Sequence, residues 1–224
     1  MSKQKRIIKR SALVLLLGCF MLQLAGCRQT ELEERCFPLL VAVDYEDDEA
    51  KVTFCAGFPR AENSGGSTGQ TSELQVSKAS GDTFAKSRQE YEKNLNKVPD
   101  YNHLKVLVLG EDFVDNPAAY DEMLDHLAKT EEFPRNTYVC MVEDVDELLE
   151  LDEELPQDLG TYLEEYLNNH EAKKNRMLTL GDLLDEKENK EMILYAPYLE
   201  PEETYVEWGG YYAIGANMPP VEFE

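Results

Sequence analysis

The sequence is poor in basic residues and in the residue types that most catalytic and metal sites use. The chain of 224 residues has 22 Lys and Arg against 45 Asp and Glu, a net charge of −23 at pH 7, and only three His. Without a basic stripe the chain has nothing to neutralise phosphates, so we expect no nucleic-acid partner. The same acidic balance argues against adhesion of the folded surface to anionic lipid.

Recognisable catalytic motifs are also missing. There is no Gly-x-x-x-x-Gly-Lys-Ser/Thr phosphate loop and no His-Glu-x-x-His zinc motif. The Gly-rich segment Gly65–Gly69 lies in a polar stretch typical of a linker and not between a strand and a helix. It therefore does not mark the Gly-x-Ser-x-Gly elbow that presents a nucleophile. We interpret His103, His126 and His170 as surface or structural residues. The pair Asp125-His126 superficially resembles that of metal-dependent phosphohydrolases, but their outlying His and Asp ligands are missing.

Three acidic clusters raise the question of calcium binding. They are Asp44–Glu49, Glu143–Glu154 and Asp182–Glu188, and none has the ligand spacing of an EF-hand loop. We interpret them as solvated helix faces and turns. The sequence thus predicts no metal, no cofactor and no catalytic residue, and the protein is not expected to be an enzyme.

The N-terminus has the organisation of a bacterial lipoprotein signal. A basic start without acids is followed by an apolar run of 15 residues, 12–26, which is shorter than the ~20 residues that cross a bilayer. The run ends in Leu24-Ala25-Gly26-Cys27, which resembles a lipobox. We predict a signal peptide over 1–26 and lipid attachment at Cys27; the alternative is an uncleaved anchor helix in which Cys27 is incidental. The basic residues are Lys3, Lys5, Arg6, Lys9 and Arg10.

Cleavage before Cys27 would leave a strongly anionic chain that its lipid holds at the membrane. Residues 1–26 contain five positive charges and no acid, so the remainder carries 17 positive and 45 negative charges, a net charge of −28. Two acyl chains, at ~0.8 kcal/mol per buried CH₂, anchor stably where one chain is marginal. We expect residues 27–36 to form a lipidated tether and residues 37–224 to form one domain that contacts another protein.

Three cysteines remain after Cys27. Cys36, Cys55 and Cys140 are an odd set, and their spacings match no zinc pattern. Cys55 and Cys140 lie in strand-like apolar runs, so we interpret them as small buried hydrophobic residues. A disulfide between Cys36 and Cys55 stays open, because the sequence cannot decide it.

The first half of the domain predicts strands and one helix. Residues 38–45 and 51–58 are β-rich runs on either side of a polar turn and predict a hairpin. A flexible loop over 59–72 and a further strand over 73–79 follow. A helix is expected over 81–98, with one apolar face made by Phe84, Tyr91, Leu95 and Val98.

The second half alternates strands and helices. The apolar run Leu104–Gly110 predicts a central strand covered on both faces. Strands over 38–45, 51–58 and 104–110 among helices indicate an α/β fold, a mixed β-sheet flanked by helices in a single domain. The remaining expected elements are helices over 117–129, 144–152 and 157–170, a short helix capped at Thr179, and strands over 137–142, 192–195 and 205–214.

Read in order, these segments resemble the N-terminal part of the Ger(x)C family, the C-subunit lipoproteins of bacterial spore germinant receptors. The mature start keeps the family's spacing from Cys27 to Glu31-Leu32 but lacks its Trp-Asp pair. The closest likeness is the His-x-Lys-hydrophobic-Gly-Glu strand, here His103–Glu111. The other matching segments are Val41–Asp44, Ala79–Ala85, Leu124–Lys129 and Arg135–Val139.

The resemblance implies a non-enzymatic subunit anchored by its lipid on the outer face of the cytoplasmic membrane, which in the spore is the inner membrane. It implies integral-membrane A- and B-type receptor subunits as partners and a role in nutrient-triggered germination. It assigns one site residue, Cys27 for lipid attachment, and leaves any ligand-binding residues unknown. Family members are longer, so the chain is either a short variant or a truncated relative. The alternative function is an extracytoplasmic ligand-binding or envelope-assembly lipoprotein unrelated to germination.

Overall fold

A computed structural model describes residues 34–46, 51–59, 78–171, 177–189 and 193–214. The chain divides into a short unit, residues 1–34, and a larger unit, residues 35–224, and every element below belongs to the larger one. The predicted signal peptide, Cys27 and most of the predicted tether lie outside the described residues. Within the described part of the chain, no helix combines the length and the hydropathy that crossing a membrane requires.

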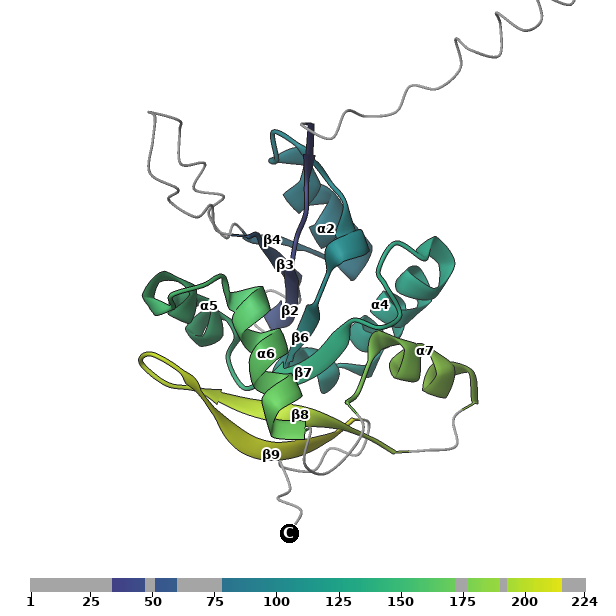
Figure 1. The fold of residues 1–224 in the computed structure, drawn as a ribbon. Helices are drawn as coiled ribbons and strands as arrows, with labels where there is room; N and C mark the ends of the chain where they lie inside the picture. Colours follow the sequence, from purple (N-terminus) through teal and green to yellow (C-terminus); the bar gives the residue numbers. More distant parts are fainter. Residues whose placement is uncertain (1–33, 47–50, 60–77, 172–176, 190–192, 215–224) are drawn as a thin grey trace, which may run out of the picture. The chain divides into compact units, whose positions relative to one another are not determined.

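The larger unit is built on a seven-stranded sheet (Figure 1). Its strands run in the order β4-β3-β2-β6-β7-β8-β9, and the central strands β2, β6, β7 and β8 are parallel to one another, whereas β3, β4 and β9 are antiparallel to their neighbours. The predicted mixed sheet is therefore confirmed. The strands are β2 (Leu40–Glu46), β3 (Lys51–Gly57), β4 (Lys78–Gly81), β6 (Val106–Gly110), β7 (Tyr138–Val142), β8 (Leu194–Pro201) and β9 (Val206–Ile214).

Helices cover both faces of this sheet. Side chains of α2, α4 and α7 pack in one core cluster and those of α5 and α6 in another. Capping residues begin them: Thr83 accepts from the Lys86 N–H, and Asn116 accepts from the Ala119 N–H ahead of Pro117. The helices are α2 (Phe84–Lys93), α3 (Glu111–Val114), α4 (Pro117–Thr130), α5 (Val145–Glu154), α6 (Leu159–Glu171) and α7 (Leu180–Asn189).

Strand β6 lies at the centre and is buried along its whole length, as the sequence predicts. Leu107 and Leu109 point into the cluster under α2, α4 and α7, while Val106 and Val108 point into the cluster under α5 and α6. The two clusters differ in composition. The first contains nine buried Phe and Tyr rings, and the second contains only Leu, Val, Ala and Cys among its buried members.

One predicted helix boundary is wrong. The helix expected over 81–98 ends at Lys93, and Val98 is not on its apolar face but in the two-residue strand β5 (Val98–Pro99), with 54% of its surface exposed. Strand β5 pairs with β1 (Arg35–Cys36), and a short 3₁₀ turn, η2 (Tyr101–His103), follows. A residue before proline avoids the helical region, which explains why the helix cannot reach Val98.

Other boundaries agree more closely. The hairpin 38–45/51–58 is β2 and β3, and the strand expected over 192–195 is β8, which continues to Pro201. Of the strand expected over 73–79, the structure describes only the last residues, at the start of β4. Most of the loop expected over 59–72 lies outside the described residues.

Candidate functional site

The three cysteines of the larger unit are free and buried. Burial raises the pKa of Cys55 and of Cys140 to about 12, so neither thiol ionises near neutral pH. The Cys55 thiol lies 3.5 Å from the Ala42 carbonyl oxygen, to which it donates. The interpretation of Cys55 and Cys140 as small hydrophobic residues is confirmed, and the open disulfide between Cys36 and Cys55 does not form in this structure.

The histidines contact aromatic rings. His103 meets Phe37 edge to face, with 5.2 Å between ring centroids, and His126 lies 5.7 Å from the ring of Phe84. Burial, together with Arg88, lowers the pKa of His126. The side chain of His170 lies outside the described residues. Within those residues, no group of three or more His, Cys, Asp and Glu side chains is placed to hold a metal ion.

Two of the sequence segments that carry the family resemblance meet at the carboxyl end of β2 and β6. Asp44, near the end of β2, accepts hydrogen bonds from the N–H groups of Tyr45, at 2.8 Å, and Val145. Its carboxyl group rests against Gly110, where a Cβ would overlap it. Burial, and then the nearby Asp112 and Asp144, raises the pKa of Asp44 to about 6. Asp44 therefore joins the end of β2 to the start of α5.

Two tyrosines bind carboxylates on the segment after β6. The Tyr198 hydroxyl donates to Glu111 Oε2 at 3.2 Å, and the Tyr212 hydroxyl donates to Asp115 Oδ1 at 2.7 Å. The two rings stack with centroids 6.1 Å apart. Burial raises the pKa of Glu111 and of both phenols, so the hydroxyls stay protonated as donors.

These hydrogen bonds fasten the hairpin of β8 and β9 to the parallel part of the sheet. The ladder between β7 and β8 contains a single pair, Met141 with Tyr198. Pro197, the residue before Tyr198, has no N–H to add to that ladder. The tyrosine–carboxylate contacts join residues 87 and 97 positions apart, and no sequence pattern signals a contact of that kind.

Charge is distributed unevenly over the larger unit. Residues 143–171 and 193–214, which form α5, α6, β8 and β9, contain sixteen Asp and Glu and no Lys or Arg. Two cations reach these elements from elsewhere in the described chain: Lys78 pairs with Asp146 at 2.6 Å, and Lys105 pairs with Glu164 at 2.7 Å. We call α5, α6, β8 and β9 together the anionic end.

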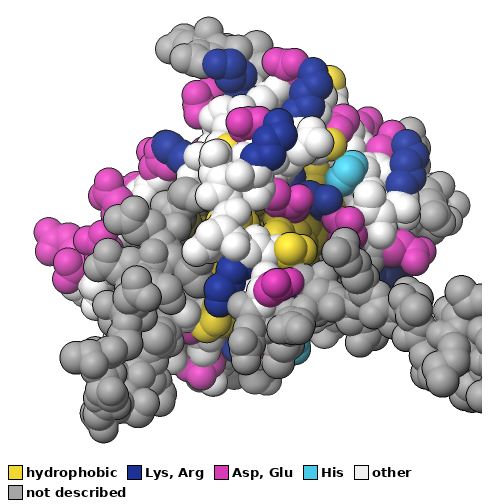
Figure 2. Space-filling model, turned by 90° about the horizontal axis from the view of Figure 1, so that it is seen from above, with side chains coloured by type: hydrophobic (Ala, Val, Ile, Leu, Met, Phe, Trp, Pro, Cys, Tyr) yellow, Lys and Arg dark blue, Asp and Glu magenta, His cyan; other side chains and the backbone are white. Residues whose placement is uncertain are grey.

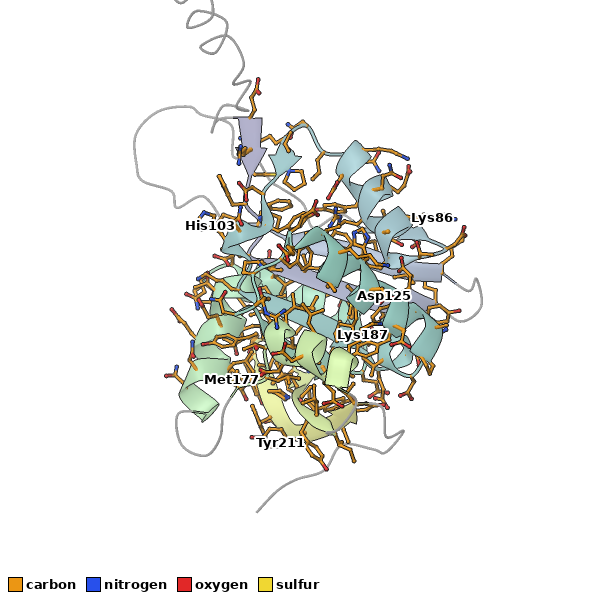
Figure 3. The ribbon with its side chains drawn as sticks, turned by 90° about the vertical axis from the view of Figure 1, so that its right-hand side faces the viewer. Lys86, His103, Asp125, Met177, Lys187 and Tyr211 are labelled. Atoms are coloured by element: carbon orange, nitrogen blue, oxygen red, sulfur yellow. The ribbon has the colours of Figure 1, made fainter. Side chains whose placement is uncertain are left out.

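The elements around α2 are different. Figure 2 looks down on the end that carries α2 and shows Lys and Arg side chains interspersed with Asp and Glu. Lys93 pairs with Glu90 at 2.7 Å, and Arg88 pairs with Glu92 at 3.1 Å. Figure 3 shows Lys187 beside Asp125, which it contacts at 3.2 Å across α7 and α4. Several charges on this side are therefore paired within or between neighbouring helices.

Exposed apolar side chains gather on the hairpin of the anionic end. Of the four large hydrophobic side chains that are exposed in the described residues, Ile193 (55%), Tyr195 (39%) and Tyr205 (46%) lie in or next to it. Trp208 meets Tyr211 edge to face at 5.2 Å, and Tyr211 lies toward the opposite end of the larger unit from Lys86 and His103 (Figure 3). Reasoning from the sequence missed this surface, although the absence of Lys and Arg after residue 190 is visible there.

The sequence of the chain matches a known protein family. The family described as "Spore germination protein N-terminal domain" matches residues 28–201. A matching solved structure is described as the crystal structure of the GerBC protein, with 16% sequence identity and a TM-score of 0.35. That likeness covers 79% of this chain and 49% of the GerBC chain, so the chain spans about half the length of that relative. No curated protein matches significantly. The family match begins directly after Cys27 and ends at the last residue of β8, before β9.

Proposed function

Because the chain belongs to the Ger(x)C family of spore germination proteins, which matches it over residues 28–201, we propose that it is the lipid-anchored C-type subunit of a spore germinant receptor. It acts in nutrient-triggered germination by contacting the integral-membrane A- and B-type subunits, on the outer face of the inner spore membrane. It catalyses no reaction. The extent of the family match carries this proposal, since it spans most of the larger unit rather than one short motif.

The chemistry of the buried groups supports a binding role. The thiols of Cys55 and Cys140 are protonated and enclosed in the core. The half-buried carboxyl group of Asp44 accepts hydrogen bonds from backbone N–H groups, and Glu111 accepts one from the hydroxyl of Tyr198. Cys55, Asp44 and Glu111 thus have partners within the fold, and Cys140 packs in the core under α5 and α6.

The anchor is tested by replacing Cys27. Cys27→Ala removes the proposed thiol, and we expect the variant to leave the membrane fraction and to lose incorporation of an alkyne-labelled fatty acid. Cys36→Ala is the matched control, because Cys36 is a buried free thiol of the domain. Retention of Cys27→Ala in the membrane fraction with full label would overturn the lipid anchor.

The receptor role is tested by deleting the gene in a strain without redundant copies. Spores should then fail to germinate with nutrients but still germinate with agents that act downstream of the receptors. An unchanged nutrient response would refute the receptor role, and loss of both responses would point to a general defect in spore assembly instead.

A further inference from the structure

We propose that the edge strand β9 and the carboxylates around it form the docking surface for a basic, extended segment of a partner subunit. The inference rests on the proposed function and deepens it, because it names the surface through which the subunit makes its contact. Three independent features of the anionic end carry it: a strand edge that no other described strand pairs with, acidic residues without Lys or Arg among them, and exposed aromatic side chains.

The open edge comes from the sheet order. Strand β9 is the last strand of the sheet, and within the described residues it pairs on one side only, with β8. From Gly210 to Ile214 the register with β8 is regular, and the irregularity between Tyr198 and Leu199 lies before it. An extended strand of this kind presents alternate N–H and C=O groups outward, which a further strand can pair with.

The negative charge of the hairpin favours a basic partner segment. The hairpin carries Glu200, Glu202, Glu203 and Glu207, and neither its residues 193–214 nor those of α5 and α6 include a Lys or Arg. Among the residues that the structure describes, two cations reach the anionic end, and they bind α5 and α6, at Asp146 and Glu164, and not the hairpin. The resulting negative potential attracts segments rich in Lys and Arg and repels an anionic lipid surface.

Aromatic side chains supply contact area. Tyr195 and Tyr205 are exposed on the hairpin, and Trp208 packs half-buried against the cluster under α5 and α6. The Tyr205 hydroxyl donates to Glu207 at 3.1 Å, which places a ring and a carboxylate side by side. Lys and Arg side chains bind such pairs well, because the stem packs on the ring while the charge meets the carboxylate. Tyr and Trp are also the residues that dominate protein interfaces.

The end around α2 fits this partner less well. The three cations of α2 are paired with neighbouring acids, as Lys93 is with Glu90, and the exposed apolar residue Val98 lies in the short strand β5. Strand β4, at the other edge of the sheet, has only four residues. The hairpin therefore combines length, charge and aromatic surface in a way that no other described edge does.

A peptide-binding experiment tests the surface directly. The probe is a fluorescent octapeptide of alternating Lys and Val, compared with one of alternating Glu and Val, added to the full chain in detergent. We expect binding of the Lys-Val peptide only, weakened at least tenfold by raised salt, with slower hydrogen exchange at the amides of Gly210–Ile214. Absence of binding, or protection confined to other elements, would overturn the proposal.

Two matched double variants separate the edge from general electrostatics. Glu203→Lys with Glu207→Lys reverses two exposed charges on the hairpin, and Glu150→Lys with Glu153→Lys reverses two exposed charges on α5. The hairpin variant should weaken the Lys-Val peptide at least tenfold, and the α5 variant less than threefold. Equal losses in the two variants would show that the peptide senses only net charge, which contradicts a defined docking surface.

The same variants distinguish the failure of this inference from that of the proposed function. In spores, the hairpin variant should lose the nutrient response while the protein stays in the membrane fraction, and the α5 variant should respond normally. A gene deletion without effect on nutrient germination would refute the receptor role. A deletion with an effect, combined with a normal hairpin variant, would refute only the docking surface.

Discussion

The two faces of the sheet share the same strands but differ in the side chains of their cores and in the charges of the helices that cover them. Under α2, α4 and α7 the core is rich in rings, such as Phe54, Phe84 and Tyr91, which meet edge to face. Under α5 and α6 the core is aliphatic and the outer surface carries carboxylates alone. The helices of the first face therefore contain both signs of charge, whereas α5 and α6 contain only acids.

The largest effect is expected from truncating the cores. Phe84→Ala removes a fully buried ring that contacts Phe54 and Phe133, and should lower the free energy of unfolding by about 4 kcal/mol; Leu163→Ala on the other face should lower it by about 3 kcal/mol. Urea unfolding at pH 7 measures both. Trp208, the one Trp of the chain, reports from the α5–α6 side.

That reporter decides whether the faces form one cooperative unit. If they do, Phe84→Ala shifts the Trp208 fluorescence transition and the far-ultraviolet circular dichroism transition by the same amount. A fluorescence midpoint that stays in place while the circular dichroism midpoint falls would show that the two faces unfold separately. The two faces would then differ in stability as well as in composition.

A smaller effect is expected where each face brings a helix close to the backbone. Gly160 is the second residue of α6, and a Cβ there would lie 2.9 Å from the carbonyl carbon of Leu39; Gly181 is the second residue of α7, and its Cβ would lie 3.0 Å from the Arg135 oxygen. We expect Gly160→Ala to lose about 2 kcal/mol and Gly181→Ala about 1 kcal/mol. Gly57→Ala is the control, since its nearest neighbour would be at 3.5 Å. A gain in stability at Gly160 would contradict the close packing of α6.

The sequence predicts the elements of both faces well, because their periodicity is local. The alternation of strands and helices, the doubly covered strand β6 and the start of α4 at Pro117 all follow from short segments. The helix expected over 81–98 ends at Lys93, and this boundary could not be predicted from the local pattern. The reason is that Val98 and Pro99 form β5, which pairs with β1, far away in the sequence. This pairing becomes visible only in the tertiary structure.

The site is less predictable than the fold for a related reason. Asp44 is recognisable as the end of a strand, but its contact with Gly110 depends on the pairing of β2 with β6. The tyrosine–carboxylate contacts of Tyr198 and Tyr212 depend on where the hairpin docks. The anionic end is visible in the sequence as stretches without Lys or Arg, yet the order of strands is needed to place those stretches together. The lipid attachment at Cys27 stays a prediction.

At the carboxyl end of β2 the expected effect is about 1 kcal/mol and depends on pH. Because the folded pKa of Asp44 is about 6, above its ordinary value of 3.8, its contribution to stability is full below pH 3.8 and is lost as pH rises through 6. Asp44→Asn keeps an acceptor for the N–H groups but no charge. After allowance for solvent screening, it should stabilise the protein by about 1 kcal/mol at pH 7.5 and have almost no effect at pH 4. A stabilisation that is equal at the two pH values would contradict the pKa shift.

The smallest effect concerns the cations that the anionic end receives from outside. Lys105 contacts Glu164 and donates to Thr161 on α6, and the two charged side chains are half-buried, so Lys105→Met should lower the free energy of unfolding by about 0.7 kcal/mol at low salt and by less at 0.5 M salt. Lys86→Met is the control, because its pair with Asp82 is exposed to solvent beside α2 and should contribute less than the Lys105 pair. If both variants lose equally little, α6 does not need the outside charge. The fold would then be stable without a cation beside the carboxylates of α6, and the two faces would differ only in amino-acid composition.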